Sequence, residues 1–473
     1  MDNLAWDWLV LTKEQRAQKL KALIAGQANL PTGQVGKDYI QLVDAGKLGV
    51  YASLGSHFDY AIFGRDSIQV AEDLLDSHQP LAQRIIHTLA SLQGIKTDTR
   101  NEEEAGKIHH EYRALKMHGS TVSEQSVEIL RKLQDKWGDP GTDYVRYYGS
   151  YDATPLFIRL VGRYVQRYGP GLLDEPYQAL DGPKKIKDSL QAAVSWLTSK
   201  IDGSDWGLLE YQRLNKDFGL ANQVWKDSGT SYLHSDSSLP NFEAGIAAIE
   251  LQGYAYDALE IAQVLLLSSP QKDYWHQLSS RLQAETASRF WMPQQNYFAQ
   301  ALDHDTDNNP RQIDTLTSNP GLLLDSKLLD NLPEAQSYID ALATMLMSPE
   351  FLTPAGIRCR ALCHKQMPGF VDYHGSYTVW PKETYAISRG LRAHGKANLA
   401  SKLESCLLDS VKRAGEFYEF FYVDDREKAY YDQSEALEHF RTISLDKNLA
   451  VAEPGQAWTI SAVLAILSRS IKQ

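Results

Sequence analysis

Acidic side chains that stand beside aromatic ones offer the clearest chemistry in this sequence. Asp227 lies in a polar stretch between Gly219 and Gly229, two positions after Trp225. An indole that shields a carboxyl from water disfavours its charged form, so the carboxyl can keep its proton near neutral pH. A general acid must hold such a proton. Taken alone, the stretch is equally compatible with a turn in which Asp227 caps a helix N-terminus.

Two stretches nearer the N-terminus also bring charged side chains together. Arg65 and Asp66 come immediately before an apolar-periodic helix, where Asp66 or Ser67 could equally be an N-cap. Farther along, His110 and Glu111 precede Arg113. This run lacks the histidine pair at i and i+4 that binds zinc on a helix, so no metal site is expected.

Glu416 and Glu419 supply acidic groups late in the chain, among Phe and Tyr residues. Cleavage of a glycosidic bond needs two carboxyl groups: one protonates the leaving oxygen, and the other activates water or attacks carbon. The spacing predicts that the two Glu stand one helical turn apart, so that at most one points into a cavity. The solvated face of a helix would show the same pattern.

Helical periodicity dominates the rest of the chain. After Trp458, the apolar residues Ile460, Val463, Leu464 and Leu467 recur at steps of three and four, which predicts a helix with one buried stripe. Strand-like alternation is scarce, and the predicted class is all-α. Similar stripes occupy about 13–26, 66–98, 121–136, 153–168, 184–199, 240–267, 271–289, 334–347, 383–394 and 396–413.

No linker, charge block or Pro-rich stretch divides the chain. We therefore predict one domain over residues 1–473, with residues 1–45 as a possible N-terminal helical extension. About a dozen helices with long connections suit a double ring of helices. A solenoid of helix pairs would have similar dimensions, but no repeat of fixed period is visible.

Composition limits the partners. The formal net charge is −12 and no Lys/Arg cluster stands out, which argues against nucleic acid or an anionic membrane. No basic-then-apolar leader and no run of 18 apolar residues is present, so a cytoplasmic protein is expected. Cys359, Cys363 and Cys406 are expected to be ordinary reduced thiols.

The stretches gain weight because they occur together and in order, over about residues 50 to 470. In them the chain resembles the bacterial amylo-α-1,6-glucosidase and debranching-enzyme-like group of six-hairpin glycosidases. The matching blocks are Phe63–Ser67, Gly106–Arg113, Tyr148–Phe157, Leu209–Arg213 leading into Asn222–Ser228, Thr353–Arg358, Tyr373–Pro381 and Pro454–Trp458.

This resemblance implies an (α/α)6 barrel and an inverting hydrolase without metal or organic cofactor. Its general acid is the Asp of the Trp-Lys-Asp-Ser block, hence Asp227. Its base is a Glu late in the chain, for which Glu419 fits better than Glu416, since it is followed by two Phe and its spacing from Trp380 is closer. Glu416 is the reserve.

The resemblance also implies a subsite that binds the terminal sugar. Trp225 and Trp380 are expected to form walls, because pyranose C–H faces pack on indoles. His374 and Glu210 are weaker candidates, equally compatible with supporting roles. The remaining expected substrate-binding residues are Arg65, Asp66, His110, Glu111, Tyr151, Asp152 and Lys226, with Glu416 in reserve.

The expected substrate is an α-linked glucoside, such as a short α-1,6- or α-1,4-linked glucan. Val224 replaces the family's Gly, and Lys382 and Glu383 replace its His-Asp, so a different pocket shape is expected. One alternative is a small compatible-solute glycoside such as glucosylglycerate. Its anionic aglycone would need a cation near the cleft, and Arg65, Arg213 and Lys226 lie in the blocks.

Two further alternatives use the same fold without hydrolysis. A sugar-binding protein needs no acid and base, so the presence of both Asp227 and Glu419 argues against it. A phosphorylase would need an anion site beside the base.

Overall fold

The computed structural model describes residues 48–53, 58, 61–114, 124–266, 270–443 and 449–470. Within these ranges helices carry most of the regular structure, and the strands are only two to four residues long, which confirms the helix-rich prediction. The helix predicted at about 13–26 and the extension over 1–45 lie outside the described residues. No helix in the described part of the chain has the length and apolar character needed to cross a bilayer.

The observed helices match most predicted stripes. The predicted segment 66–98 is two helices, because the chain turns after Asp73 and Pro80 starts a new helix in its first turn. The predicted segment 240–267 becomes helical only at Ile249. The helices are α4 (Gly64–Asp73), α5 (Gln79–Ser91), α6 (Glu124–Trp137), α7 (Ala153–Tyr168), α8 (Ile186–Asp202), α9 (Ile249–Leu265), α10 (Lys272–Phe290), α11 (Ala335–Leu346), α12 (Pro381–Ala393), α13 (Ala397–Ala414), α14 (Gln433–Ile443) and α15 (Ala457–Ser470), with the 3-10 helices η4 (Pro170–Asp174), η5 (Asn319–Asp325) and η6 (Leu362–His364).

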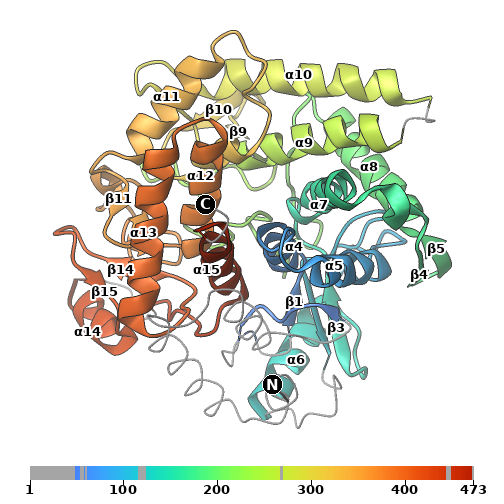
Figure 1. Cartoon of the computed structure of the whole chain (residues 1–473), viewed down its shortest axis with the longest axis horizontal. Coiled ribbons are helices and arrows are strands. Elements are labelled where there is room, and N and C mark those ends of the chain that lie inside the picture. The colour runs from blue at the N-terminus through green and yellow to red at the C-terminus, as the bar shows by residue number, and fades with distance from the viewer. Residues whose placement is uncertain are drawn as a thin grey trace.

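Six of these segments form a closed ring. Going round, α4 packs against α7, α7 against α9, α9 against η5, η5 against α12, α12 against α15, and α15 against α4 (Figure 1). Helices α5, α8, α10, α11 and α13 pack against members of the ring as a second layer. One close approach is between α12 and η5, where a Cβ on Gly390 would lie 2.4 Å from the backbone carbonyl carbon of Leu324. Glycine is required there by the packing distance.

Short antiparallel strands lead into three of the ring segments. Strand β1 (Ala61–Phe63) runs directly into α4 and pairs with β2 (Glu111–Ala114), which pairs with β3 (Tyr144–Tyr147). In the same way, β6 (Ala247–Ala248) precedes α9 and β13 (Thr378–Val379) precedes α12. These strands fix where the helices begin.

The other strands belong to the connections between helices. Strand β6 pairs with β9, which pairs with β10, while β13 pairs with β14, which pairs with β15. The pairs β4–β5, β7–β8 and β11–β12 are separate hairpins. Their bounds are β4 (Pro176–Ala179), β5 (Gly182–Lys185), β7 (Trp291–Met292), β8 (Tyr297–Phe298), β9 (Ala301–His304), β10 (Pro310–Ile313), β11 (Leu352–Thr353), β12 (Gly356–Ile357), β14 (Phe421–Val423) and β15 (Ala429–Tyr430).

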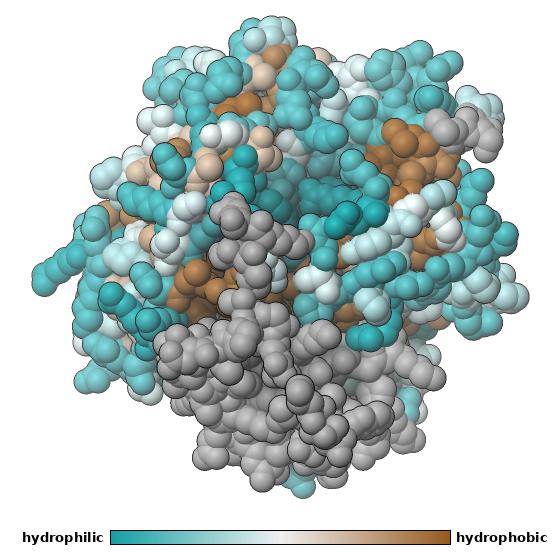
Figure 2. Space-filling view, viewed as in Figure 1, coloured by the Kyte–Doolittle hydropathy of each residue, from teal (hydrophilic) through white to brown (hydrophobic). Residues whose placement is uncertain are grey.

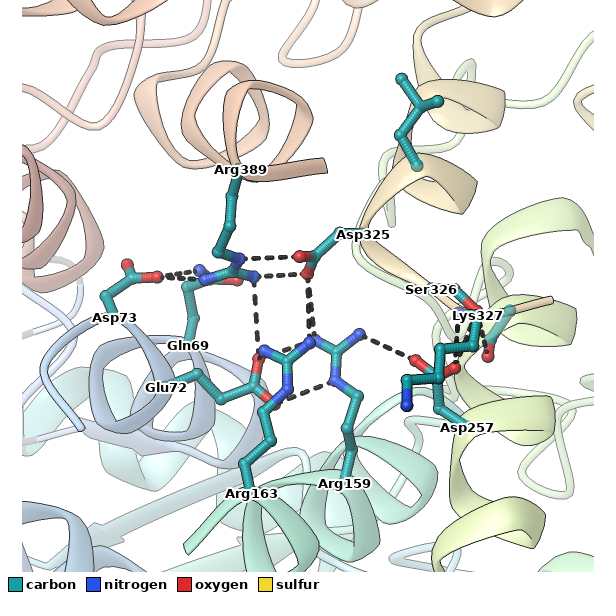
Figure 3. Close-up of polar contacts among 12 residues, drawn as sticks. Gln69, Glu72, Asp73, Arg159, Arg163, Asp257, Asp325, Ser326, Lys327 and Arg389 are labelled. Carbon is teal, nitrogen blue, oxygen red and sulfur yellow. Dashed lines mark hydrogen bonds and ion pairs between the residues drawn. The ribbon is translucent and has the colours of Figure 1, made fainter. Parts of the chain in front are cut away.

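A buried ionic network, drawn in Figure 3, ties the ring together toward the C-terminal ends of its segments. Arg159 of α7 donates to both carboxylate oxygens of Glu72 in α4, at 2.9 and 2.6 Å. Arg389 of α12 donates to Asp325 of η5 at 2.8 and 2.5 Å and to Asp73 of α4 at 2.7 Å. Figure 2 shows hydrophilic residues gathered in the middle of this face. The opposite ends of the same segments hold the candidate site.

Candidate active site

Arg65 joins two carboxylates that the sequence places far apart. Its guanidinium, in the first turn of α4, donates to Asp152 at 3.1 and 2.8 Å and to Asp227 at 3.2 Å. The side chain of Asp152 is fully buried, whereas that of Asp227 is 34% exposed. Asp227 is therefore held by a buried cation while part of its carboxyl reaches open space.

The surroundings of Asp227 favour a retained proton. Burial raises the pKa of this carboxyl to about 6, against the opposing charge of Arg65 and with the help of Asp152. The residues after Asp227 are not helical until α9 begins at Ile249, so the alternative of a helix N-cap is wrong.

Asp66 lies inside the first turn of α4, not at its N-cap. The helix begins at Gly64 and its N-cap is Phe63, which makes no side-chain cap, so the N-cap alternative for Asp66 is also wrong. Burial raises the pKa of Asp66 to about 7, although Arg65 and Lys382 oppose this rise.

Glu416 and Glu419 do not share a helix. Helix α13 ends at Ala414, and Gly415 takes a left-handed conformation (φ 63°), so the prediction of one helical turn between the two Glu is wrong. Glu416 accepts hydrogen bonds from the backbone N–H groups of Phe417 (2.8 Å) and Gly455 (3.2 Å). These two contacts bind the Glu416 carboxylate to the backbone, so Glu416 has a structural role.

Glu419 has a different environment. Its carboxylate accepts from the Tyr373 hydroxyl at 3.3 Å and from the Glu453 N–H at 3.4 Å. Burial raises the pKa of Glu419 well above its usual range, and the charges of Glu453 and Asp66 add to this rise. Both Glu419 and Asp227 raise the pKa of Tyr373, so the predicted acid and base lie within electrostatic reach of one hydroxyl.

Aromatic rings, Trp225 and Trp380 among them, pack together beside these groups. The Trp380 ring lies 5.3 Å from Trp225, 5.1 Å from His374 and 5.6 Å from Trp458, between ring centroids. Its Nε1 donates to the Tyr373 carbonyl at 2.7 Å. These contacts connect Trp380, which precedes α12, with Trp225, two residues before Asp227, and with Tyr373, whose hydroxyl contacts Glu419.

His374 supports the stretch that carries Asp227. Its Nδ1 lies 3.1 Å from the Ser228 hydroxyl and 3.2 Å from that of Ser231. Burial, with the charges of Lys226 and Lys382, lowers the pKa of His374 well below its usual range, so the ring is neutral.

His110 and Glu111 flank the site from the β1–β2–β3 sheet. The His110 ring packs edge-on between Phe63 and Tyr147, and burial together with the Arg65 charge lowers its pKa. Glu111 is ion-paired with Arg113.

Tyr151 also has packing partners. Its hydroxyl donates to a backbone carbonyl, that of Gln212, at 3.5 Å. Its ring packs against Trp196 and lies 4.7 Å from the ammonium of Lys107.

Two predicted substrate-binding residues have other partners. Lys226 is 1% exposed, pairs with Glu383 at 3.2 Å and donates to Ser318 at 2.6 Å, so its cation is already neutralised. Glu210 bonds to His304 at 2.9 Å and accepts from Ser204. No contact between described residues joins Glu210 to the carboxylates described above.

Tyr373, Lys382 and Trp458 were not selected from the sequence, although all three lie in or beside matching blocks. Lys382 departs from the resembling family's pattern, and this departure was the available signal. Among the described residues, no three His, Cys, Asp or Glu side chains are grouped so as to hold a metal ion. Cys359, Cys363 and Cys406 are free thiols.

Comparison with known proteins identifies the class as glycoside hydrolases. A family model, the mannosylglycerate hydrolase MGH1-like glycoside hydrolase domain, matches residues 182–439, which is more than half of the chain and includes Asp227 and Glu419. The chain belongs to this MGH1-like family of glycoside hydrolases. The match supports a glycosidase, but not specifically an amylo-α-1,6-glucosidase. No curated protein sequence matches the chain.

Solved structures share the fold. A GH63 mannosylglycerate hydrolase from Thermus thermophilus, in complex with glucose, is 14% identical with a TM-score of 0.59, covering 92% of this chain and 100% of that one. The same enzyme in complex with Tris and D-glycerate has a TM-score of 0.58, with the same identity and coverage. A protein described as a wild-type glycosidase is 12% identical with a TM-score of 0.58, covering 96% of this chain and 98% of that one.

Proposed function

We propose that this chain hydrolyses a small glycoside, with Asp227 as general acid and Glu419 as general base. The observation that carries the proposal is the position of Asp227: a partly exposed carboxyl, bound to Arg65, whose pKa burial raises to about 6. Asp227 donates its proton to the glycosidic oxygen as the bond to the anomeric carbon breaks. Glu419 takes a proton from the water that attacks that carbon.

The charges around Glu419 favour water as the nucleophile. Glu453 and Asp66 are acidic, and the Tyr373 hydroxyl is neutral. A phosphate ion at this position would be repelled by the carboxylates. Hydrolysis is therefore favoured over phosphorolysis, and attack opposite the leaving group would invert the anomeric centre.

The substrate we propose has a negatively charged aglycone, as mannosylglycerate and glucosylglycerate do. Of the three cations considered from the sequence, Arg65 and Lys226 are engaged by carboxylates. Arg213 makes no ion pair with a described residue, and its buried Nε has no hydrogen-bond partner. It follows Gln212, whose carbonyl contacts Tyr151, on the connection that leads to Asp227. Arg213 is thus suited to bind a carboxylate.

We propose that the ring of six packed helical segments is the inner ring of an (α/α)6 barrel. We also propose that the chain is one catalytic domain. The closed sequence of packed segments and the second layer of helices support this.

A panel of glycosides tests the activity. We expect hydrolysis of mannosylglycerate or glucosylglycerate, at a rate independent of added phosphate, and little hydrolysis of α-1,4- or α-1,6-linked glucans. Phosphate-dependent turnover would instead indicate a phosphorylase. Turnover of the glucans alone would overturn the proposed substrate.

Asp227→Asn should lower kcat by about 10²–10⁴-fold, since the amide cannot donate the proton that the leaving oxygen needs. Asp217→Asn, at an exposed position on the same connection, is the control and should leave kcat unchanged. Full activity of the Asp227 variant would refute the assignment. Proton NMR of the first sugar released tests inversion, because an α-glycoside should yield the β-anomer first.

A further inference from the structure

Lys382 carries a cation for which no described residue provides a hydrogen bond or an ion pair. Its side chain extends from the first turn of α12 and is 7% exposed. The ammonium lies 4.2 Å from the centre of the Trp225 ring and 5.1 Å from that of Trp458. Two indole faces attract the charge but accept none of its three N–H groups in ordinary hydrogen bonds.

Lys226 is a buried lysine whose ammonium has both hydrogen-bond and ion-pair partners. Its ammonium bonds to Ser318, to the Cys359 carbonyl and to Glu383. Lys382 lies against the same indole, 4.2 Å from the Trp225 ring, and has none of these contacts. A buried ammonium without acceptors is unfavourable, so a bound ligand can supply the acceptors that the described residues do not.

Asp66 is a hydrogen-bond acceptor without a donor among the described side chains. Its carboxylate is buried and accepts no hydrogen bond from a described side chain, although its charge interacts with that of Lys382. No ion pair joins these two described groups. Neither the Lys382 ammonium nor the Asp66 carboxylate is among the fully enclosed polar atoms that lack a hydrogen-bond partner, so both keep some access to solvent. The first turns of α4 and α12 therefore hold an unused acceptor and an unused donor within electrostatic reach of each other, and the charges of Arg65 and Asp227 act on the same carboxylate.

We propose that Lys382 and Asp66 together bind two neighbouring hydroxyl groups of the terminal sugar. Lys382 donates to the hydroxyl oxygens and Asp66 accepts from the hydroxyl hydrogens. This inference rests on the proposed function and specifies the sugar that the site takes. Arg65 and Lys382 are opposed by Asp66 and Asp152 while Asp227 holds its proton, so these described charges leave little net positive charge to attract a uronic acid or a phosphorylated sugar, and an uncharged sugar is favoured.

Binding of methyl α-mannoside, methyl α-glucoside and their monodeoxy derivatives, measured by calorimetry, tests the pair. Lys382→Met should weaken binding of the better parent glycoside by about 10- to 100-fold, as expected for a lost charge-assisted hydrogen bond. At least one monodeoxy derivative should bind the native protein as weakly, and the variant should no longer distinguish it from the parent. Asp66→Asn should lose discrimination at the same or the adjacent hydroxyl.

Lys402→Met, at an exposed position on α13, is the matched control and should bind like the native protein. Unchanged affinity in the Lys382 variant would overturn the proposal, as would an equal loss for every derivative or no binding of any of these sugars. Calorimetry needs no turnover, so the two proposals can fail separately. Hydrolysis without the hydroxyl-specific pattern refutes the Lys382–Asp66 pair, whereas the pattern without hydrolysis refutes only the proposed reaction.

Discussion

Asp227 and Glu419 have raised pKa values for the same main reason, burial, but their neighbours differ. Arg65 opposes the rise at Asp227, whereas Glu453 increases it at Glu419. Because the two groups are close enough to influence one hydroxyl, their titrations belong to the site as a whole.

The pH profile of kcat/KM should be bell-shaped. Activity should fall as pH rises through the pKa of about 6 at Asp227, because the acid loses its proton. It should also fall at low pH as Glu419 is protonated, at a pKa above the ordinary value of 4.5.

Glu453→Gln removes a charge that raises the pKa of Glu419 but keeps the backbone N–H that donates to it. The acidic limb of the profile should therefore move to lower pH, while the alkaline limb stays in place. Glu438→Gln, on an exposed face of α14, is the control. An acidic limb that stays in place or moves upward would contradict the role of Glu453.

At this scale the sequence predicted residue types better than it predicted partners. The setting of Asp227 beside Trp225 could be anticipated from two neighbouring residues. The ion pair of Lys226 could not be anticipated, since Glu383 and Ser318 reach it only in the folded chain. Nor could it be anticipated that no described residue pairs with Lys382.

Among the elements, the short strands before α4, α9 and α12 determine where side chains enter the site. They were missed because two or three residues are too few to show an alternating pattern. The helices were predicted well because their stripes run over three or more turns. The break after α13 depends on one left-handed Gly415, which the helical spacing of Glu416 and Glu419 concealed.

Gly64→Ala tests the positioning of α4. A Cβ at this residue would lie 2.2 Å from the His109 carbonyl oxygen, so the helix start must shift and carry Arg65 and Asp66 with it. A displacement of this kind should lower kcat/KM by about 10- to 100-fold. Gly171→Ala, where no atom lies within 4 Å, is the control. Native activity in the Gly64 variant would show that the helix start does not set the site.

In the molecule as a whole, the ionic network is the feature that joins the ring segments. It binds α4 to α7, η5 and α12, and Ser461 of α15 adds a hydrogen bond to Asp73 at 2.8 Å. Helical content was predictable from periodicity. The order of packing around the ring was not, because it depends on contacts between segments distant in the chain.

Arg159→Met should destabilise the fold by about 1.5–3 kcal/mol, because buried Glu72 loses its bidentate partner while it keeps the ion pair with Arg163 at 3.0 Å. Arg167→Met, on the same helix, breaks an exposed pair with Asp76 and should cost less than about 1 kcal/mol. Urea midpoints of the two variants measure the difference. Similar midpoints would mean that the network contributes little to stability.

The contact between α15 and α4 has a consequence for biosynthesis. The hydrogen-bonded pair Asp73 and Ser461 is separated by 388 residues, and α15 is the last ring segment to leave the ribosome. At about 5–20 residues per second, α4 waits roughly 20–80 s for its neighbour. During that interval the nascent chain presents an apolar flank of α4 that α15 later covers, and a chaperone that binds such surfaces can bind there.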